Sequence, residues 1–576
     1  MATKRAAKKK RKPKLSVEEL KARKLKRDHI RAARTIFRNL GFDRVSEVAG
    51  AEVAFENQRG EFDDAYIREN VIILLEYTTS KSENVKDHLK KKKIFFSKIA
   101  QNPVGFIAEL RSRLPKFEAR LADKFHDDKY ILKMLYCSRN SFDDGVKKVV
   151  DEPVYLDFPI LKYFEKLAST IKISALNEFL EFVGIANGQI AENGKFPKRD
   201  SSDVYEGSIL PESSSGFPRG YKVVSFYADP AALLLRAYVL RSSGWRGSRQ
   251  AYQRMLRGSK IEAIRKNLKA EKRVFVNNLI ATLPNDAHPV DQSGKTIDIT
   301  KLTNTSKVTI RLPSCTNSVG LIDGQHRLYS YYESRNDDLR IATLRHQQNL
   351  LVTGIIYPPQ ITQSEKDRFE ADLFLSINAN QTNASTALKQ DIEVVLRPFS
   401  PTAIGREIMR RLAGSSPLAG HVETYFFDKG KLKTSSIVSY GLGPLIKLGG
   451  EDSLFRIFKH PEKDNIASGG SEAGLEAYLQ FATSTINAFL GAVKDNVDQS
   501  RWTSDRAVND RLLTVTYVNS FLIVLRLLIQ ARQKIRHDSL KESLKGLNSF
   551  NFKSYRSSQY GRMAEKIFEK YFDEAT

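Results

Sequence analysis

An apolar run that ends in a carboxylate constrains the fold of this chain more than any other feature. Val71 to Leu75 are five apolar residues in a row, and Glu76 follows them directly. A continuous apolar run of this length is typical of a strand buried in a sheet. Burying the Glu76 carboxylate there is costly unless the charge is paired or binds a metal ion. The run therefore predicts a β-sheet with a polar site at the end of one strand.

The segments around this run alternate between helical and extended patterns. A helical pattern ending at Gly41 places Ile30, Ala33, Ile36, Phe37 and Leu40 on one face. Extended stretches follow at residues 51–57, 60–67 and 70–79, then a basic helix at 83–100 and a further strand at 129–138. This order predicts an α/β domain spanning residues 28–150.

The rest of the chain divides by composition and pattern. A length of 576 residues indicates several domains. Residues 151–220 read as a connecting strand, a helix and a linker or surface loop rich in Ser, Gly and Pro. A second α/β domain is predicted at 221–395, and residues 396–576 have an almost entirely helical pattern.

The chain carries a large excess of positive charge. Lysine and arginine number 93 against 67 aspartates and glutamates, which gives a net charge of +26 and a field that attracts polyanions. Residues 1–27 read as a basic, disordered arm, which is either simply solvated or binds a polyanion. Nucleic acid is the favoured partner, and an acidic protein is an alternative. The candidate DNA contacts are Lys86, Lys90, Lys91, Arg246 and Arg249.

Several protein classes are excluded by what the sequence lacks. No run approaches the roughly 18 apolar residues of a membrane span, and the basic start is unlike a signal peptide. Two cysteines, Cys137 and Cys315, are too few for a disulfide framework or a zinc cluster. The common sequence motifs of P-loop, serine-hydrolase and zinc-protease enzymes are absent too. We therefore expect a cytoplasmic protein with no membrane partner.

Two acids, Asp63 and Glu76, mark the first candidate site. Asp63 stands near the start of one predicted strand and Glu76 near the end of the next. Two carboxylates that converge at one sheet edge suit Mg²⁺, which prefers oxygen ligands. The ion can orient a water molecule and neutralise charge that builds on a phosphate.

In element order and in its D-x₁₂-E spacing, this region resembles the PD-(D/E)XK nuclease superfamily. The resemblance implies a restriction-endonuclease-like α/β domain that binds and cuts DNA, with Asp63 and Glu76 as catalytic metal ligands for Mg²⁺. The family usually has a lysine two residues after the glutamate, where this chain has Thr78. Either a lysine from elsewhere replaces it, or the fold binds DNA without cutting it. The candidate replacements are Lys81, Lys86 and Lys90.

Residues 318–333 form a second candidate site, with an apolar strand, a tight polar turn and a helix-like segment. Gly324 permits a tight turn, and the first turn of the next helix offers free N–H groups to a phosphate. Arg327 can pair with phosphate oxygens, and His326 can donate to a phosphate or move a proton near neutral pH. Asp323 can hold a metal ion, orient His326 or cap the helix.

Three stretches together are similar to the DGQHR-domain family, which includes DndB-type regulators found with DNA phosphorothioation gene clusters. The signature "DGQHRL" covers residues 323–328. A segment with Gln253 and Arg254 looks like the family's QR segment, and "DLFLSINANQTNAS" resembles its F-x-x-I-N segment. The latter carries Phe374, Ile377, Asn378 and Gln381, and the whole resemblance covers about residues 220–400.

The DGQHR family is similar to the ParB/sulfiredoxin fold, whose Gly-x-x-Arg turn binds nucleotide phosphates. By this resemblance, the phosphates of ATP or another nucleoside triphosphate lie against Gly324, Gln325, His326 and Arg327, with His326 and Asp323 as catalytic candidates. Asn378 and Gln381, expected on a loop, complete the pocket or hold a base or ribose, although Asn378 also suits a helix cap. Gln253 and Arg254 reach the same pocket or a DNA backbone.

These features together predict a DNA-binding protein of a prokaryotic DNA-modification or phage-defence system. The expected activities are a DNA endonuclease in the N-terminal domain and a nucleoside triphosphatase in the central one. Expected partners are DNA, other proteins of the same operon and further copies of the chain, packed through the all-α C-terminal region. The alternatives are a non-catalytic DNA-binding regulator and an RNA-binding protein.

Overall fold

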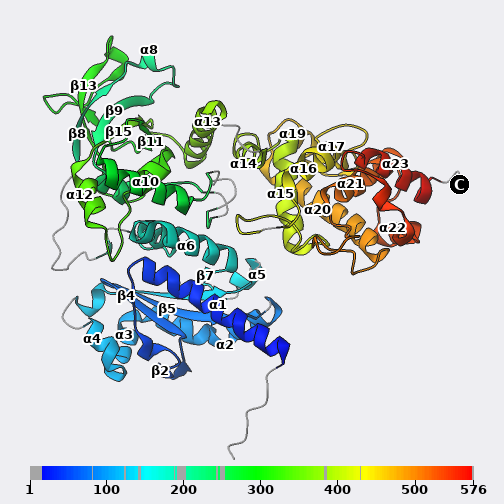
Figure 1. Ribbon diagram of the computed structural model, residues 1–576, viewed down its shortest axis with the longest axis horizontal. Coiled ribbons are helices and arrows are strands. Elements are labelled where there is room, and N and C mark those ends of the chain that lie inside the picture. The colour runs from blue at the N-terminus through cyan, green and yellow to red at the C-terminus, as the bar shows by residue number, and fades with distance from the viewer. Residues whose placement is uncertain are drawn as a thin grey trace, which may run out of the picture.

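The chain folds into three parts, which Figure 1 shows in sequence order from blue to red. The computed structural model describes residues 16–573 except 81, 122–124, 141–143, 149, 187–188, 191–202, 242–243, 247–252, 382–385 and 429. The first two parts are α/β and the third is helical, so the predicted α/β multidomain class is confirmed. No helix within these described residues is long and apolar enough to cross a membrane.

The N-terminal part is built on a five-stranded mixed sheet. Its strands are β1 (Asp43–Arg44), β4 (Asp64–Arg68), β5 (Val71–Thr78), β6 (Ile131–Ser138) and β7 (Val154–Leu156), in that spatial order. The first two pairings are antiparallel, and β5, β6 and β7 are parallel. A separate hairpin is formed by β2 (Val53–Phe55) and β3 (Gln58–Gly60).

Helices cover both faces of this sheet, which is why all eight residues of β5 are buried. Val71, Ile73 and Leu75 share a core with α1 and α6, whereas Ile72 and Leu74 pack with α2 and α3 on the other face. The helices of this part are α1 (Val17–Asn39), α2 (Ser82–Gln101), α3 (Pro103–Arg113), α4 (Pro115–Leu121), α5 (Asp144–Lys147), α6 (Phe158–Ile171) and α7 (Leu176–Phe182). The prediction of a buried strand at 71–75 is therefore confirmed.

Helix α1 begins earlier than the sequence analysis predicts. The Ser16 side chain accepts a hydrogen bond from the Glu19 N–H, and the Glu19 carboxylate accepts one from the Ser16 N–H. This capping box starts the helix, and the Lys, Arg, Glu and Leu residues that follow favour it. Residues 17–27 are thus helical rather than a disordered arm, while residues 1–15 lie outside the described residues.

The expected connecting segment, residues 151–220, is divided between the two α/β parts. Strand β7 joins the first sheet through β6, and α6 packs against α1. Strand β8 (Val204–Ile209) lies in the stretch expected to be a linker, yet it pairs with β9 and β13 of the second sheet. The expected strand and helix are therefore present, but the expected linker contains a strand of the second sheet, whose pairing with β13 joins residues about a hundred positions apart.

The central part contains an eight-stranded mixed sheet. Its strands are β8, β9 (Lys222–Ala228), β10 (Ala237–Tyr238), β11 (Leu279–Leu283), β12 (Pro289–Val290), β13 (Ser306–Arg311), β14 (Val319–Asp323) and β15 (Leu350–Ile356), in the spatial order β10-β14-β11-β15-β9-β8-β13-β12. Its helices are α8 (Glu212–Ser215), α9 (Pro230–Arg236), α10 (Gly258–Glu271), α11 (Gln325–Tyr329), α12 (Leu339–Gln347) and α13 (Gln363–Gln381). One apolar cluster contains residues of both sheets, so the two parts pack against each other.

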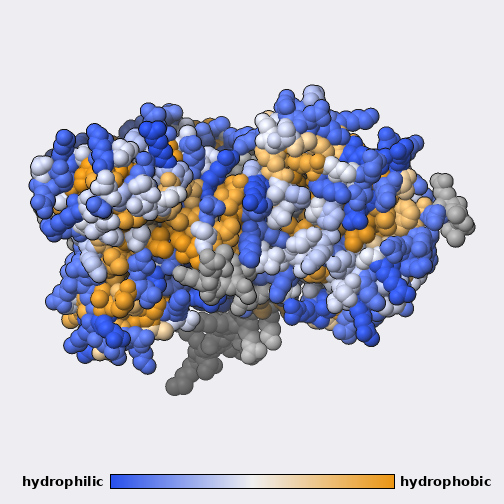
Figure 2. Space-filling model, turned by 90° about the horizontal axis from the view of Figure 1, so that it is seen from above, coloured by the Kyte–Doolittle hydropathy of each residue, from blue (hydrophilic) through white to orange (hydrophobic). Residues whose placement is uncertain are grey.

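The C-terminal part has its own apolar core and, among the described residues, only helices as regular elements. The helices are α14 (Thr386–Leu396), α15 (Pro401–Ser415), α16 (Thr434–Ser436), α17 (Gly443–Ile446), α18 (Leu454–Ile457), α19 (Lys463–Ala467), α20 (Glu472–Asp495), α21 (Val515–Gln530), α22 (His537–Ser543) and α23 (Tyr560–Tyr571). On the face in Figure 2, hydrophobic residues form several separate patches among hydrophilic ones. The expected homo-oligomer thus stays a prediction.

Candidate active site and nucleotide pocket

The structure brings Asp63 and Glu76 together, as the D-x₁₂-E spacing predicts. Asp63 directly precedes β4, and its main-chain N–H donates to the Leu75 carbonyl at 2.9 Å. Its Oδ2 accepts a hydrogen bond from the Tyr77 N–H at 2.7 Å, which fixes the carboxylate beside the end of β5. Asp63 is close enough to Glu76 for its negative charge to raise the pKa of Glu76.

Glu76 is a buried carboxylate with one oxygen paired and the other free. Lys92 Nζ lies 2.5 Å from Glu76 Oε1, and His88 Nε2 lies 3.7 Å from the same oxygen. Oε2 is buried and has no hydrogen-bond partner among the described residues. Burial raises the pKa of Glu76 to about 7, although the Lys92 ammonium acts in the opposite direction. A further cation beside Oε2 would therefore stabilise the charged form of Glu76.

Lys92 supplies the positive charge that Thr78 cannot. Val85, Leu89 and Phe96 are the buried face of α2, and Lys92 lies on the same stripe at helical spacing. Its ammonium also donates to the Glu61 carbonyl at 3.1 Å, so it is held on both sides. Lys92 lies on the expected helix, but the candidates Lys86 and Lys90 are exposed on that helix, and Lys81 lies outside the described residues.

The carboxylates fit a weakly held magnesium ion rather than a protein-enclosed one. The described residues hold no group of three or more His, Cys, Asp or Glu side chains arranged for a metal. Mg²⁺ needs fewer protein ligands, because it usually keeps several waters and is bound by one or two carboxylates together with substrate phosphates. The unpaired Oε2 of Glu76 and the neighbouring Asp63 meet that requirement.

The expected DNA contacts fall into two groups. Lys86, Lys90 and Lys91 are exposed on α2 and have no carboxylate partner among the described residues, so they are available to a polyanion. Arg246, by contrast, is largely buried, and its guanidinium lies 2.7 Å from Glu181 and 3.4 Å from Glu178. Its assignment as a DNA contact was wrong because both carboxylates already pair with it. Arg249 lies outside the described residues.

The DGQHR stretch forms the predicted strand, turn and helix. Strand β14 ends at Asp323, and Gly324 has φ of +95°. A Cβ atom at Gly324 would lie 2.4 Å from Leu279 Cδ2, so glycine is required for both conformation and space. Helix α11, however, has only five residues. The macrodipole of so short a helix is small, so its N-terminus alone attracts a phosphate only weakly.

The three family-like stretches converge on one pocket, as the resemblance implies. A cavity of about 430 Å³ lies between the α11 turn, the start of α10 and the end of α13. Its lining includes Gln253, Arg254, Arg257, Lys260, Asp323, Gly324, Gln325, His326, Arg327, Phe374 and Asn378. Four of these side chains are cationic and one is a carboxylate, so the pocket suits an anion.

Arg327 and His326 line this pocket, but both already have partners within the protein. Arg327 donates to Asp323 Oδ2 at 3.0 Å and to the Asn278 carbonyl at 2.8 Å. His326 Nε2 lies 3.2 Å from the main-chain N–H of Arg257, which donates to it. Burial, with the nearby Lys260, lowers the pKa of His326 to about 4. His326 is therefore neutral near pH 7, and its expected role in proton transfer stays a prediction.

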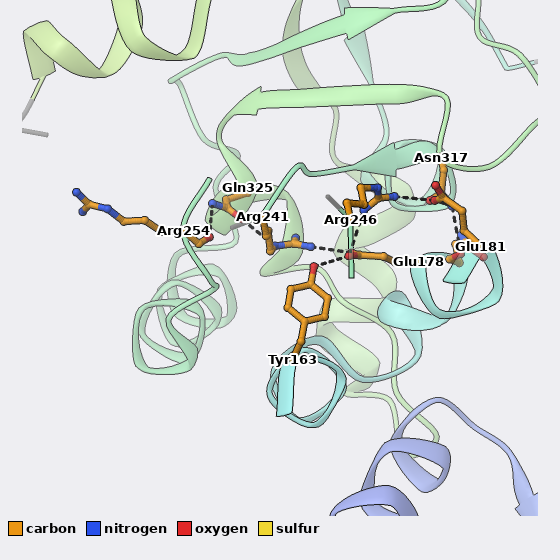
Figure 3. Close-up of polar contacts among 9 residues, drawn as sticks. Tyr163, Glu178, Glu181, Arg241, Arg246, Arg254, Asn317 and Gln325 are labelled. Carbon is orange, nitrogen blue, oxygen red and sulfur yellow. Dashed lines mark hydrogen bonds and ion pairs between the residues drawn. The ribbon is translucent and has the colours of Figure 1, made fainter. Parts of the chain in front are cut away.

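Gln253, Gln325 and Asn378 also have internal partners. Gln253 is buried and donates to the Leu321 carbonyl at 2.7 Å. Gln325 accepts from Arg241 Nε at 3.4 Å and donates to the Arg254 carbonyl at 3.3 Å (Figure 3). Asn378 lies near the end of α13, not on a loop, and donates to the Phe374 carbonyl at 2.9 Å.

The cations best placed for an anion in this pocket are two that the sequence analysis did not single out. Arg257 and Lys260 are exposed at the start of α10 and line the cavity beside Arg254. They stand within the same basic segment as the QR pair, which was the available signal. Gln381 ends α13, and its side chain lies outside the described residues.

Comparison with known proteins identified no relative of this chain. No protein-family model, curated protein or solved structure matches the chain. The resemblances to the PD-(D/E)XK and DGQHR families therefore rest on the sequence motifs alone.

Proposed function

We propose that this protein binds DNA and hydrolyses its phosphodiester bonds with Mg²⁺ at the Asp63–Glu76 site. The observation that carries the proposal is the Lys92 ammonium, 2.5 Å from Glu76 and on the same stripe of α2 as the buried residues. A buried acid, a second acid beside it and an ammonium are the groups that the PD-(D/E)XK chemistry uses. Here the lysine comes from a helix instead of the strand.

Each side chain has a distinct role in this proposal. Asp63 and Glu76 would hold the ion through their carboxylate oxygens. A bound Mg²⁺ would supply positive charge to a phosphate and would activate a water molecule. Lys92 holds Glu76 in position and donates a hydrogen bond to a phosphate oxygen or to the attacking water. The exposed Lys86, Lys90 and Lys91 on α2 hold the DNA backbone nearby.

The direct test is cleavage of supercoiled plasmid by the full chain. We expect nicked or linear DNA with Mg²⁺ and none with EDTA. Because the pKa of Glu76 is about 7 in the metal-free protein, protons compete with Mg²⁺ below that pH. The Mg²⁺ concentration for half-maximal cleavage should therefore fall as pH rises to about 7 and then level off. Absence of cleavage under every condition would favour a non-catalytic DNA-binding regulator.

A second proposed function is nucleotide binding in the central pocket. Arg254, Arg257 and Lys260 surround one side of the 430 Å³ cavity, and that charge suits the phosphates of ATP or another nucleoside triphosphate. The pocket supports binding better than hydrolysis, because His326 is neutral and accepts a main-chain hydrogen bond while Asp323 pairs with Arg327.

Lys260→Ala, combined with Arg257→Ala, should weaken binding of a fluorescent ATP analogue by at least tenfold at low salt, since each cation contributes about 1 kcal/mol or more to a phosphate contact. Lys266→Ala with Arg273→Ala is the charge-matched control, because both residues are exposed and neither lines the pocket. Equal affinity of the double variant and the control would refute the phosphate site.

The wider setting follows from the resemblance to DGQHR-domain proteins. We propose that the protein acts in a prokaryotic DNA-modification or phage-defence system in the cytoplasm, with other proteins of the same operon, and that nucleotide in the central pocket gates DNA engagement. A homo-oligomer formed through the C-terminal helices belongs to the same proposal. RNA remains the alternative polyanion, which competition between RNA and DNA duplexes distinguishes.

A further inference from the structure

A basic groove runs along α1, on the face of the sheet opposite to the Asp63–Glu76 site. Figure 1 shows α1 lying alongside α6 over the sheet. The groove has a volume of about 920 Å³. Eight cationic side chains line it with a single carboxylate, Asp43: Arg23, Lys26, Arg27, Arg31, Arg34, Arg38, Arg44 and Arg335.

The cations on α1 form one continuous stripe. Arg23, Arg27, Arg31, Arg34 and Arg38 are spaced by four, four, three and four residues, which places them on the same helix face. Like charges at this spacing repel each other and destabilise a helix. All five are exposed, and only Arg34 has a carboxylate partner among the described residues. The stripe is therefore a surface whose repulsion an anionic ligand would relieve.

A buried carboxylate fixes the wall of the groove. Asp64 is fully buried, and it accepts hydrogen bonds from Arg34 at 2.9 Å, from Arg44 and from the Tyr77 hydroxyl at 2.9 Å. The partly exposed guanidinium groups of Arg34 and Arg44 are thereby held against the groove. Arg335, from the central part of the chain, is held in the same way by Asp43 at 2.8 Å. Such anchoring lowers the entropy cost of binding.

We infer that this groove binds the sugar–phosphate backbone of DNA, without regard to base sequence. The stripe from Arg23 to Arg38 is about 22 Å long at 1.5 Å per residue, which matches an extended polyanion better than a small one. The aromatic residues of the lining, Phe42 and Tyr66, are buried, so neither bases nor a partner's side chains have an exposed ring to stack on. The groove therefore offers no exposed aromatic side chain of the kind that usually stabilises protein–protein interfaces, which argues against an acidic protein as the ligand.

This inference rests on the proposed function in that the ligand is the same DNA, but it adds a DNA-binding surface separate from the cleavage site and from the exposed lysines of α2. The groove lies on the α1 face of the sheet, whereas Glu76 and Lys92 lie on the α2 face. The two assignments therefore fail independently.

The test is binding of a fluorescein-labelled 30-base-pair DNA duplex to the full chain carrying Arg27→Ala and Arg31→Ala. Each lost phosphate contact makes the dependence of log K on log salt shallower by about 0.9. We therefore expect the negative slope to become shallower by about 1.8 for the loss of two contacts. The affinity at low salt should fall at least tenfold, equally for two unrelated sequences. Lys553→Ala with Arg556→Ala is the charge-matched control, because both residues are exposed in the C-terminal part.

The outcomes separate this inference from the cleavage proposal. The groove variant should need at least tenfold more DNA than the wild type for half-maximal cleavage at low salt, whereas Lys553→Ala with Arg556→Ala should cut like the wild type. Weaker DNA binding by the groove variant, together with no cleavage by any form of the protein, would support the groove and contradict only the cleavage proposal. The melting temperature of the groove variant should equal or exceed that of the wild type, since repulsion along α1 is reduced. An unchanged slope, a loss restricted to one sequence, or a loss seen with duplex RNA but not with DNA would overturn the assignment.

Discussion

Lys92→Ala is expected to reduce the rate of Mg²⁺-dependent DNA cleavage by about 100- to 1,000-fold, with DNA affinity within about twofold of wild type. Removal of one preorganised charged donor from an active site typically has an effect of this size. Lys92 is such a donor, since it is largely buried and is held by Glu76 Oε1 and the Glu61 carbonyl. The measurement is the single-turnover cleavage rate at saturating DNA and Mg²⁺.

Two further variants separate a catalytic role of Lys92 from a structural one. Lys91→Ala removes the same charge from an exposed neighbour on α2 and should leave the cleavage rate within about threefold of wild type. Lys92→Arg keeps the charge but changes the donor geometry, so it should recover only part of the rate. If Lys91→Ala and Lys92→Ala slow cleavage equally, the lysine serves only the general attraction for DNA, and the assigned role is wrong.

The surroundings of Lys92 show which features local sequence patterns predict and which they do not. The apolar run 71–75, the acid after it and the basic helix that follows are local patterns, and the structure confirms all three as a buried strand, a strand-end carboxylate and α2. Which lysine meets Glu76 depends on the face that α2 turns to the sheet. The apolar residues Val85, Leu89 and Phe96 define the buried face of α2, and helical spacing places Lys92 on that same face.

Other differences between expectation and structure have non-local causes. The Asn and Ser residues around 378–385 favour turns, so a loop was predicted, yet α13 continues to Gln381. Asn378 accommodates this by donating to the carbonyl four residues earlier. Arg246 looked free in the sequence because its partners Glu178 and Glu181 lie more than 60 residues away. Positive residues in a sequence are candidates for binding an anion, but ion pairs formed in the folded protein occupy some of them.

The largest stability effect is expected at Glu178, which joins the N-terminal helices to the DGQHR turn (Figure 3). Its carboxylate accepts from Arg241 at 2.8 Å, from Arg246 at 3.4 Å and from the Tyr163 hydroxyl. Glu178→Ala leaves the fully buried Arg241 guanidinium without a counter-charge, and breaking a buried pair in this way costs about 3–5 kcal/mol. We expect the melting midpoint to fall by roughly 5–10 °C.

The loss of folding free energy at Glu178 is expected to depend on the burial of the ion pair and not on the number of charges removed. Glu206→Ala breaks an ion pair of similar length with Lys307, 2.9 Å, but both partners are exposed, so a change of no more than about 1 kcal/mol is expected. Glu178→Gln keeps the shape and one acceptor, so it should fall between the two. Arg241 also donates to Gln325, which lines the proposed nucleotide pocket, and Glu178→Ala should therefore weaken the binding of the ATP analogue as well. If Glu178→Ala and Glu206→Ala melt alike, Arg241 is solvated in the protein and the buried network does not hold the two parts together.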